Sequence, residues 1–122
     1  MNDLPKLVYV DDESDIREVT EFALEDDFDL QIFACAKDFL AVSDNLIPDI
    51  ILLDVMMPEV DGPQLFERIK QIEHLKTIPT LFMTAKVQPN EVKELIELGA
   101  KGVISKPFDP LELPEQIKEF LK

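Results

Sequence analysis

Acidic side chains directly follow two short apolar runs of this chain, and carboxylates grouped in this way can bind a metal ion. Asp11 and Asp12 follow residues 7–10, and Asp54 follows residues 50–53. Two unit charges about 4 Å apart interact with about 4 kcal/mol at an effective dielectric constant near 20, so such a cluster needs a cation. Oxygen ligands without histidine or cysteine select a hard ion. Because few protein oxygens are on offer, the expected ion is Mg²⁺, with Mn²⁺ as a substitute.

A hydroxyl and an ammonium group follow two further apolar runs. Thr84 and Ala85 come after residues 80–83, and Lys106 with Pro107 comes after residues 102–105. A hydroxyl donor and a mobile positive charge are what a phosphoryl group needs beside a metal ion. A carboxylate is a competent nucleophile for phosphoryl transfer and carries no proton that a base must remove. The pattern therefore predicts that Asp54 accepts a phosphoryl group.

The apolar runs themselves are short and mostly continuous, which is typical of strands that are buried on both faces. The predicted strands are residues 7–10, 30–33, 50–53, 80–83 and 102–105. Amphipathic segments between them predict helices near residues 15–23, 38–43, 63–72, 91–98 and 110–121. Ser14 and Asn90 are the expected N-caps, and Gly99 is expected to close the fourth helix.

Strands and helices thus alternate five times within 122 residues. Right-handed crossovers then give an α/β fold with a parallel sheet and helices on both faces. Five such units favour the flavodoxin-like doubly wound order 2-1-3-4-5, in one domain over residues 1–122. Ligands bind such sheets outside the carboxyl ends of the strands, at the switch point between strands one and three. The residues that could do chemistry all follow carboxyl ends, so we expect them to converge there.

Composition limits the partners and the compartment. The net charge is −14, which argues against direct binding to nucleic acid or to an anionic membrane surface. Cys35 is the single cysteine, so an intramolecular disulfide is excluded. The sequence has neither a signal-peptide pattern nor an apolar run approaching about 18 residues. We therefore expect a soluble cytoplasmic protein.

The ordered motifs resemble the receiver (CheY-like) domains of two-component response regulators, over essentially the whole chain. The matching segments are Asp11-Asp12, residues 53–58 with Asp61-Gly62, Thr84-Ala85, and Lys106-Pro107-Phe108. The resemblance implies that Asp54 is the phosphoacceptor in a phosphorelay. It also implies metal ligation by Asp12, Asp54 and the backbone carbonyl of Met56, with Asp11 acting largely through water.

The same resemblance implies further roles and partners. Thr84, Ala85 and Lys106 would bind the phosphoryl group and report its presence, and the Lys106–Pro107 peptide bond would be cis. The donor would be a phosphohistidine of a sensor histidine kinase or of a histidine phosphotransfer protein. The face built from the fourth helix, fifth strand and fifth helix would pass on the signal. Its charges are mixed in sign, which permits dimerisation through ion pairs.

Three positions depart from the common receiver pattern. Val103 occupies the place of an aromatic residue that swings inward in many receivers, and valine has little rotamer freedom. We therefore do not expect the aromatic part of the usual switch. Met56 and Lys86 flank the expected path of the water that hydrolyses the phosphoaspartate. Because Met56 cannot orient a water and Lys86 can shield the phosphoryl group, we expect self-dephosphorylation over minutes or longer.

Three other functions remain open from the sequence. The first is a magnesium-dependent phosphohydrolase with an aspartyl nucleophile, although Met56 occupies the place of its usual second aspartate. The second is a flavodoxin-like cofactor module, although Asp11-Asp12-Glu13 stands where a phosphate-binding loop is needed. The third is a receiver-like module that binds partners without being phosphorylated. The expected class is a phosphoacceptor signalling domain rather than an enzyme acting on a separate substrate.

Overall fold

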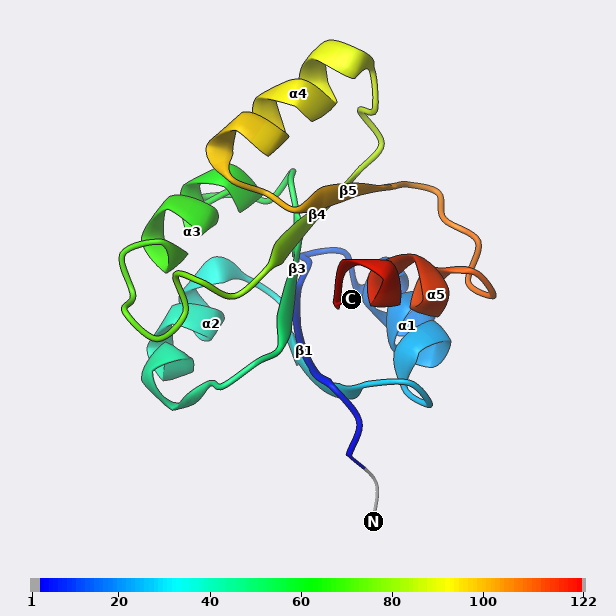
Figure 1. Ribbon diagram of the computed structural model, residues 1–122, viewed down its shortest axis with the longest axis horizontal. Coiled ribbons are helices and arrows are strands. Elements are labelled where there is room, and N and C mark those ends of the chain that lie inside the picture. The colour runs from blue at the N-terminus through cyan, green and yellow to red at the C-terminus, as the bar shows by residue number, and fades with distance from the viewer. Residues whose placement is uncertain (1–2, 122) are drawn as a thin grey trace.

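Five parallel strands form the centre of the computed structural model, which describes residues 3–121 (Figure 1). Their order in the sheet is β2-β1-β3-β4-β5, so the predicted flavodoxin-like arrangement is confirmed. Each predicted strand is present, and four of the five extend by one residue at one end. The strands are β1 (Lys6–Val10), β2 (Asp29–Phe33), β3 (Ile50–Asp54), β4 (Thr80–Thr84) and β5 (Gly102–Ser105).

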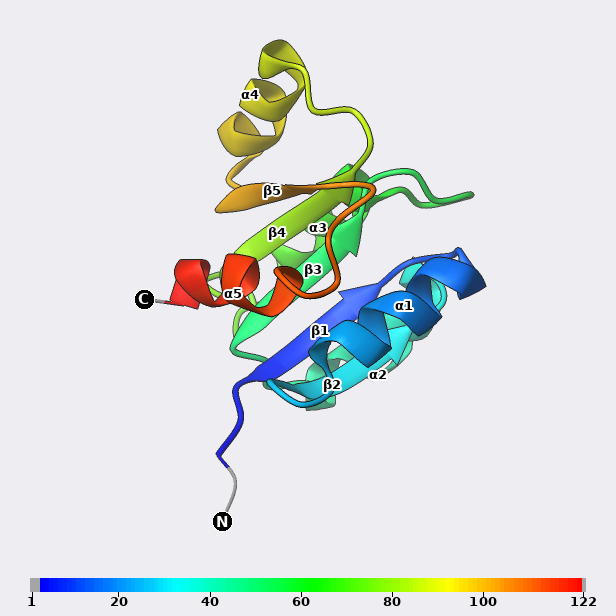
Figure 2. The same ribbon diagram turned by 90° about the vertical axis from the view of Figure 1, so that its right-hand side faces the viewer.

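Helices cover both faces of this sheet (Figures 1 and 2). They are α1 (Ser14–Leu24), α2 (Ala36–Val42), α3 (Gly62–Ile69), α4 (Pro89–Leu98) and α5 (Leu113–Lys118). Two short 3₁₀ turns, η1 (Ser43–Asn45) and η2 (Glu119–Leu121), follow α2 and α5. Helices α1 and α5 lie together on one face, whereas α2 and α3 lie on the other, with α4 next to α3 and β5. None of the described helices is long and apolar enough to cross a bilayer.

The continuous apolar runs are buried on both faces because successive side chains of a strand point in opposite directions. In β3, Ile51 and Leu53 join the core under α2, α3 and α4, while Ile50 and Leu52 join the core under α1 and α5. All four are fully buried. Burial of such a side chain contributes about 1.5–3 kcal/mol, so both hydrophobic cores fix the central strands and their carboxyl ends.

Several helix ends differ from the sequence prediction. Glu13 rather than Ser14 is the N-cap of α1, and it makes no capping hydrogen bond with its side chain. Gln88 rather than Asn90 precedes α4, although Gly99 does close that helix in the left-handed conformation, with φ of 117°. Helix α5 begins only at Leu113, because residues 109–112 form a turn around the backbone carbonyl of Asp109.

The connection from β3 to α3 passes close to the end of β3. Asp61 caps α3 with a full capping box, since its side chain accepts from the Gln64 amide while the Gln64 side chain accepts from the Asp61 amide. The Gly62 amide donates to the Val55 carbonyl at 2.9 Å. A Cβ at Gly62 would overlap the Asp54 carbonyl oxygen, so this close approach requires glycine.

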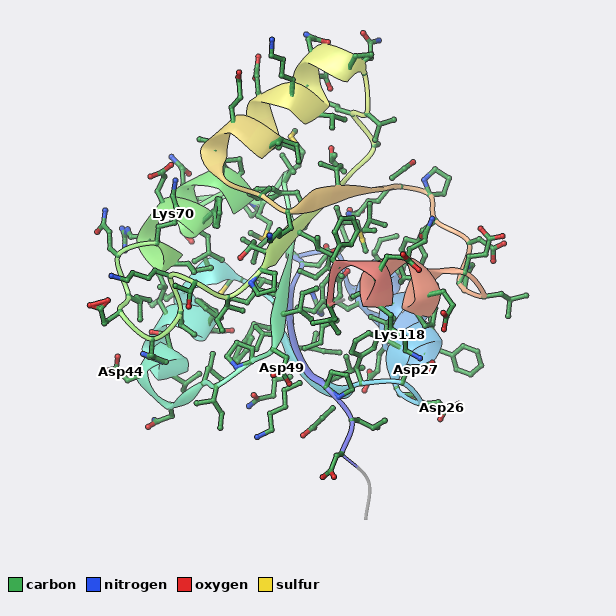
Figure 3. The ribbon with its side chains drawn as sticks, in the orientation of Figure 1. Asp26, Asp27, Asp44, Asp49, Lys70 and Lys118 are labelled. Carbon is green, nitrogen blue, oxygen red and sulfur yellow. The ribbon has the colours of Figure 1, made fainter. Side chains whose placement is uncertain are left out.

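An ion pair joins α5 to the segment that follows α1, at the end remote from the acidic residues. Lys118 on α5 donates to Asp27, which follows α1, at 2.6 Å, and Figure 3 shows the two side chains pointing toward each other. This hydrogen bond, together with the charges of Asp27 and Glu115, raises the pKa of Lys118. Both partners are about one-third exposed, so the pair contributes little to stability.

Candidate acidic site at the carboxyl edge of the sheet

Three carboxylates meet at the switch point between β1 and β3. Asp11 and Asp12 follow β1 directly, and Asp54 is the last residue of β3. One ligand oxygen from each lies within 4.8 Å of the others. Asp11 and Asp54 are only 0% and 2% exposed, while Asp12 is half-buried. The sequence therefore placed the acidic cluster correctly, since the neighbouring strands are parallel and end at the same edge.

Asp11 is held by hydrogen bonds from three directions. Its carboxylate accepts from the Tyr9 hydroxyl at 2.5 Å and from the Glu13 amide at 2.9 Å. Its backbone carbonyl accepts from Arg17 at 2.7 Å. Burial and the hydrogen bond to Asp11 raise the pKa of Tyr9, which keeps this hydroxyl a donor. Both carboxylate oxygens of Asp11 are thus engaged within the protein.

Lys106 supplies the positive charge of the site from the end of β5. Its ammonium donates to Asp54 Oδ1 at 2.9 Å and lies 3.3 Å from both Asp11 Oδ2 and Glu13 Oε1. Burial opposes that charge, but the hydrogen bond to Asp54 and the nearby carboxylates outweigh burial and raise the pKa of Lys106. The Lys106–Pro107 peptide bond is cis. The lysine therefore stays charged against the acidic cluster.

The surroundings of Asp54 disfavour its ionised form. Burial raises its pKa to about 6, the charges of Asp11 and Asp12 add to this shift, and Lys106 opposes it. Asp54 Oδ2 and Asp12 Oδ1 are buried and have no hydrogen-bond partner among the described residues. Unpartnered buried oxygens beside a third carboxylate fit a hard cation, which would satisfy them and offset their repulsion.

Thr84 ends β4 beside this cluster and is 3% exposed. Its hydroxyl oxygen accepts from the Lys86 amide at 3.0 Å, and among the described residues no hydrogen bond joins Thr84 to Asp54. Ala85 and Lys86 are exposed. The hydroxyl therefore belongs, in this arrangement, to the turn that leads into α4.

The positions that depart from the common pattern lie on either side of this edge. Met56 is 62% exposed, so most of its side chain faces solvent. Val103 in β5 is half-buried and packs against the core under α3 and α4. Its branched side chain thus packs beneath α4 and, unlike an aromatic residue at this position, has no ring to rotate.

Three residues that shape the site were assigned no role from the sequence. Tyr9 orients Asp11, Arg17 binds its carbonyl, and Glu13 contacts Lys106. The signal for Tyr9 was available, since residues two apart on a strand share a face and Tyr9 is two positions before Asp11. Arg17 lies four residues after Glu13, one turn into the helix, where its side chain can reach back to the strand end.

The comparisons with known proteins agree with this geometry. The family model for the response regulator receiver domain matches residues 7–118. The response regulator Rre1 of Synechocystis sp. is 32% identical over 117 residues, covering 94% of this chain and 51% of Rre1. The chain therefore belongs to the response regulator receiver domains of two-component signalling systems.

Solved structures give the same result. The chemotaxis protein CheY4 of Vibrio cholerae superposes with a TM-score of 0.89 at 27% identity, covering 97% of this chain and 99% of CheY4. The BeF3-activated receiver domain of DrrB superposes with a TM-score of 0.84 at 27% identity, covering 98% of each chain. The chain spans about half the length of Rre1 and of most other curated relatives it matches.

Proposed function

We propose that Asp54 accepts a phosphoryl group from a phosphohistidine of a sensor histidine kinase or of a histidine phosphotransfer protein. An oxygen of Asp54 forms a bond to phosphorus while the bond from phosphorus to the histidine nitrogen breaks, and the imidazole leaves. The observation that carries this proposal is the environment of Asp54. Lys106 binds one carboxylate oxygen at 2.9 Å, and the other oxygen is left without a partner at the carboxyl edge of the sheet.

The other polar residues of this edge have roles that follow from their chemistry. Lys106 offsets the negative charge that the phosphoryl oxygens bring to the acidic cluster. The Thr84 hydroxyl turns from the β4–α4 segment toward the phosphoryl group, with the Ala85 backbone amide beside it. Both would be hydrogen-bond donors to phosphoryl oxygens, so the same residues that bind the group also report its presence.

The acidic residues fit a Mg²⁺ ion, with Mn²⁺ as a substitute. Asp12, Asp54 and the Met56 backbone carbonyl would hold it, and Asp11 would act through water, because its own oxygens already have protein donors. When bound, the ion supplies positive charge to the phosphoryl oxygens and to the carboxylates. The unpartnered oxygens of Asp12 and Asp54 support this assignment.

We further propose that the phosphoaspartate persists for minutes or longer. Exposed Met56 cannot orient an attacking water, and exposed Lys86 can shield the phosphoryl group. Signalling would not use a swinging aromatic residue, because Val103 has no ring and little rotamer freedom. It would use Thr84, α4 and the face formed by α4, β5 and α5, which also permits dimerisation.

The chain as a whole is proposed to act as one receiver domain over residues 1–122, of which residues 1, 2 and 122 lie outside the described part. Its activity would be limited to its own phosphorylation and dephosphorylation, without turnover of a separate substrate. The proposed compartment is the cytoplasm, where a reduced cysteine such as Cys35 is usual. Direct binding to nucleic acid or membrane is not expected at a net charge of −14.

Incubation with acetyl phosphate and Mg²⁺, followed by intact mass measurement, tests the proposal. We expect one added phosphoryl group, which is lost in Asp54→Asn and prevented by a chelator. Asp44→Asn is the matched control, because Asp44 is exposed on η1, away from the acidic cluster. An unmodified wild-type protein would instead favour the receiver-like module that works without phosphorylation.

A further inference from the structure

A pocket of about 310 Å³ lies between the start of α4, the β3–α3 connection and the end of β4. It is adjacent to the acidic site, because Thr84 belongs to both. The pocket is lined by Val55, Pro63, Thr84, Lys86, Glu91, Glu94 and Leu95. Two glutamates and one lysine are therefore among the residues that border the pocket.

Glu91 is the unusual member of this lining. Its Oε2 atom is shielded from solvent and has no hydrogen-bond partner among the described residues. A buried polar atom without a partner is destabilising, and more so when the group is charged. Glu94, one turn away by helical spacing, lines the same pocket but is exposed to water. The two glutamates thus have the same chemistry but different surroundings.

Lys86 carries the opposite charge in the same pocket. Its side chain is exposed, and within residues 3–121 it takes part in none of the ion pairs. Its backbone amide donates to the Thr84 hydroxyl oxygen at 3.0 Å. Movement of the Thr84 hydroxyl would therefore alter a hydrogen bond that holds the Lys86 backbone.

We propose that Glu91 forms an ion pair with Lys86 when Asp54 carries a phosphoryl group; this inference rests on the proposed function. Reorientation of Thr84 toward the phosphoryl group alters the hydrogen bond that holds the Lys86 backbone. The Lys86 ammonium then turns into the pocket and gives Glu91 Oε2 a partner, while the methylene chain of Lys86 stays beside Thr84 and shields the phosphoryl group. This pair fixes the start of α4 in a new position. It would take the place of the swinging aromatic residue of other receivers, which is Val103 in this chain.

The pair would act as a bias between two states. Glu91 Oε2 lacks a partner in the resting state and has one in the phosphorylated state, so Glu91 contributes a different free energy to each. By linkage, that difference must strengthen binding of a phosphoryl group or its mimic. Glu91 is therefore a positioning residue, which acts through Lys86 and α4 without touching the acidic site.

A double-mutant cycle measured with beryllofluoride tests this inference. Beryllofluoride with Mg²⁺ is the phosphoryl mimic, and its apparent dissociation constant is measured by calorimetry for wild type, Glu91→Gln, Lys86→Gln and the double variant. We expect Glu91→Gln to weaken binding roughly tenfold, in the range usual for coupled sites. In the Lys86→Gln background the same change has no further effect. Glu94→Gln is the matched control and leaves binding unchanged.

Two results would overturn the inference. One is an equal effect of Glu91→Gln in both backgrounds, or none in either. The other is a loss of resistance to urea in Glu91→Gln without beryllofluoride, which indicates that the carboxylate stabilises the resting fold. Wild type that fails to bind beryllofluoride, or that binds it equally after Asp54→Asn, contradicts the proposed function itself. A failure of this inference alone leaves wild-type binding and its dependence on Asp54 intact.

Discussion

Asp54 combines burial, two like charges nearby and one opposite charge in contact. Its pKa lies at about 6 instead of the usual 3.8, so the folded state binds this proton more tightly than the unfolded state does. A raised carboxyl pKa contributes stability that is fully present below about pH 4 and is lost as the pH rises through about 6. At neutral pH and without a divalent ion, the ionised side chain is therefore destabilising.

Asp54→Asn is expected to increase the free energy of unfolding at pH 7.5 in the presence of a chelator. A shift of this size corresponds to about 1–3 kcal/mol, because the amide keeps the shape of the side chain but removes its charge. Urea denaturation of both proteins at pH 7.5 and pH 4 measures the effect. The difference should nearly vanish at pH 4, and a less stable variant at pH 7.5 would contradict the assignment.

Lys106→Met is expected to destabilise the protein at pH 7.5 by about 2–4 kcal/mol, because the carboxylates it contacts lose their cation. Lys118→Met is the matched control, since that lysine also contacts two carboxylates but is one-third exposed. Its loss should cost much less than the loss of Lys106, because solvent screens an exposed ion pair. Urea denaturation of the two variants in the same buffer measures the loss in the free energy of unfolding. Equal losses for the two variants would argue against a special role for Lys106.

At the scale of the elements, the capping box of α3 keeps the β3–α3 connection in place beside Asp54. Asp61→Ala should lower the free energy of unfolding by about 1 kcal/mol, the usual contribution of an N-cap side chain. Ser14→Ala should have almost no effect, because the start of α1 has no side-chain cap. Urea titrations compare the two variants, and a larger loss at Ser14 would contradict the observed helix starts.

The strands were predictable because burial on both faces leaves a continuous apolar run, which β1, β3 and β4 all have. Helix ends were less predictable, because a cap depends on which side chain reaches the free amides. Ser14 has a suitable side chain, yet the chain enters the helix at Glu13, whose carboxylate contacts Lys106. That contact joins residues 93 positions apart, so no local pattern could indicate it.

The residues of the acidic site could be predicted in the same way as the strands. Strand ends in a parallel sheet bring Asp11, Asp12, Asp54 and Lys106 together whatever the details of packing. The sequence could not predict that Glu91 Oε2 lacks a hydrogen-bond partner, because this depends on how the start of α4 lies against Val55 and Pro63. Spacing along a helix gives the direction of a side chain, but it does not tell whether a partner is present where the side chain ends.

At the scale of the whole molecule, the net charge of −14 and the acidic cluster both favour the binding of a cation. Mg²⁺ that binds only the folded state should increase the free energy of unfolding by about 1.4 kcal/mol at tenfold its dissociation constant. Thermal unfolding with MgCl₂, and with NaCl at equal ionic strength, separates site binding from general screening. We expect stabilisation by MgCl₂ beyond that by NaCl, and a reduced effect in Asp12→Asn.

The position of β1 between β2 and β3 has a consequence for synthesis on the ribosome. Within the domain, β1 is the first strand to be synthesised and yet a central one, and it stays without its β3 neighbour until residue 50 has been added. Lys106 comes from beyond β5, so the carboxylates lack their cationic partner until nearly the whole domain has emerged. Nascent or prematurely terminated chains would thus lack the complete site, and under the proposed function they would not compete with the full domain for a phosphoryl group.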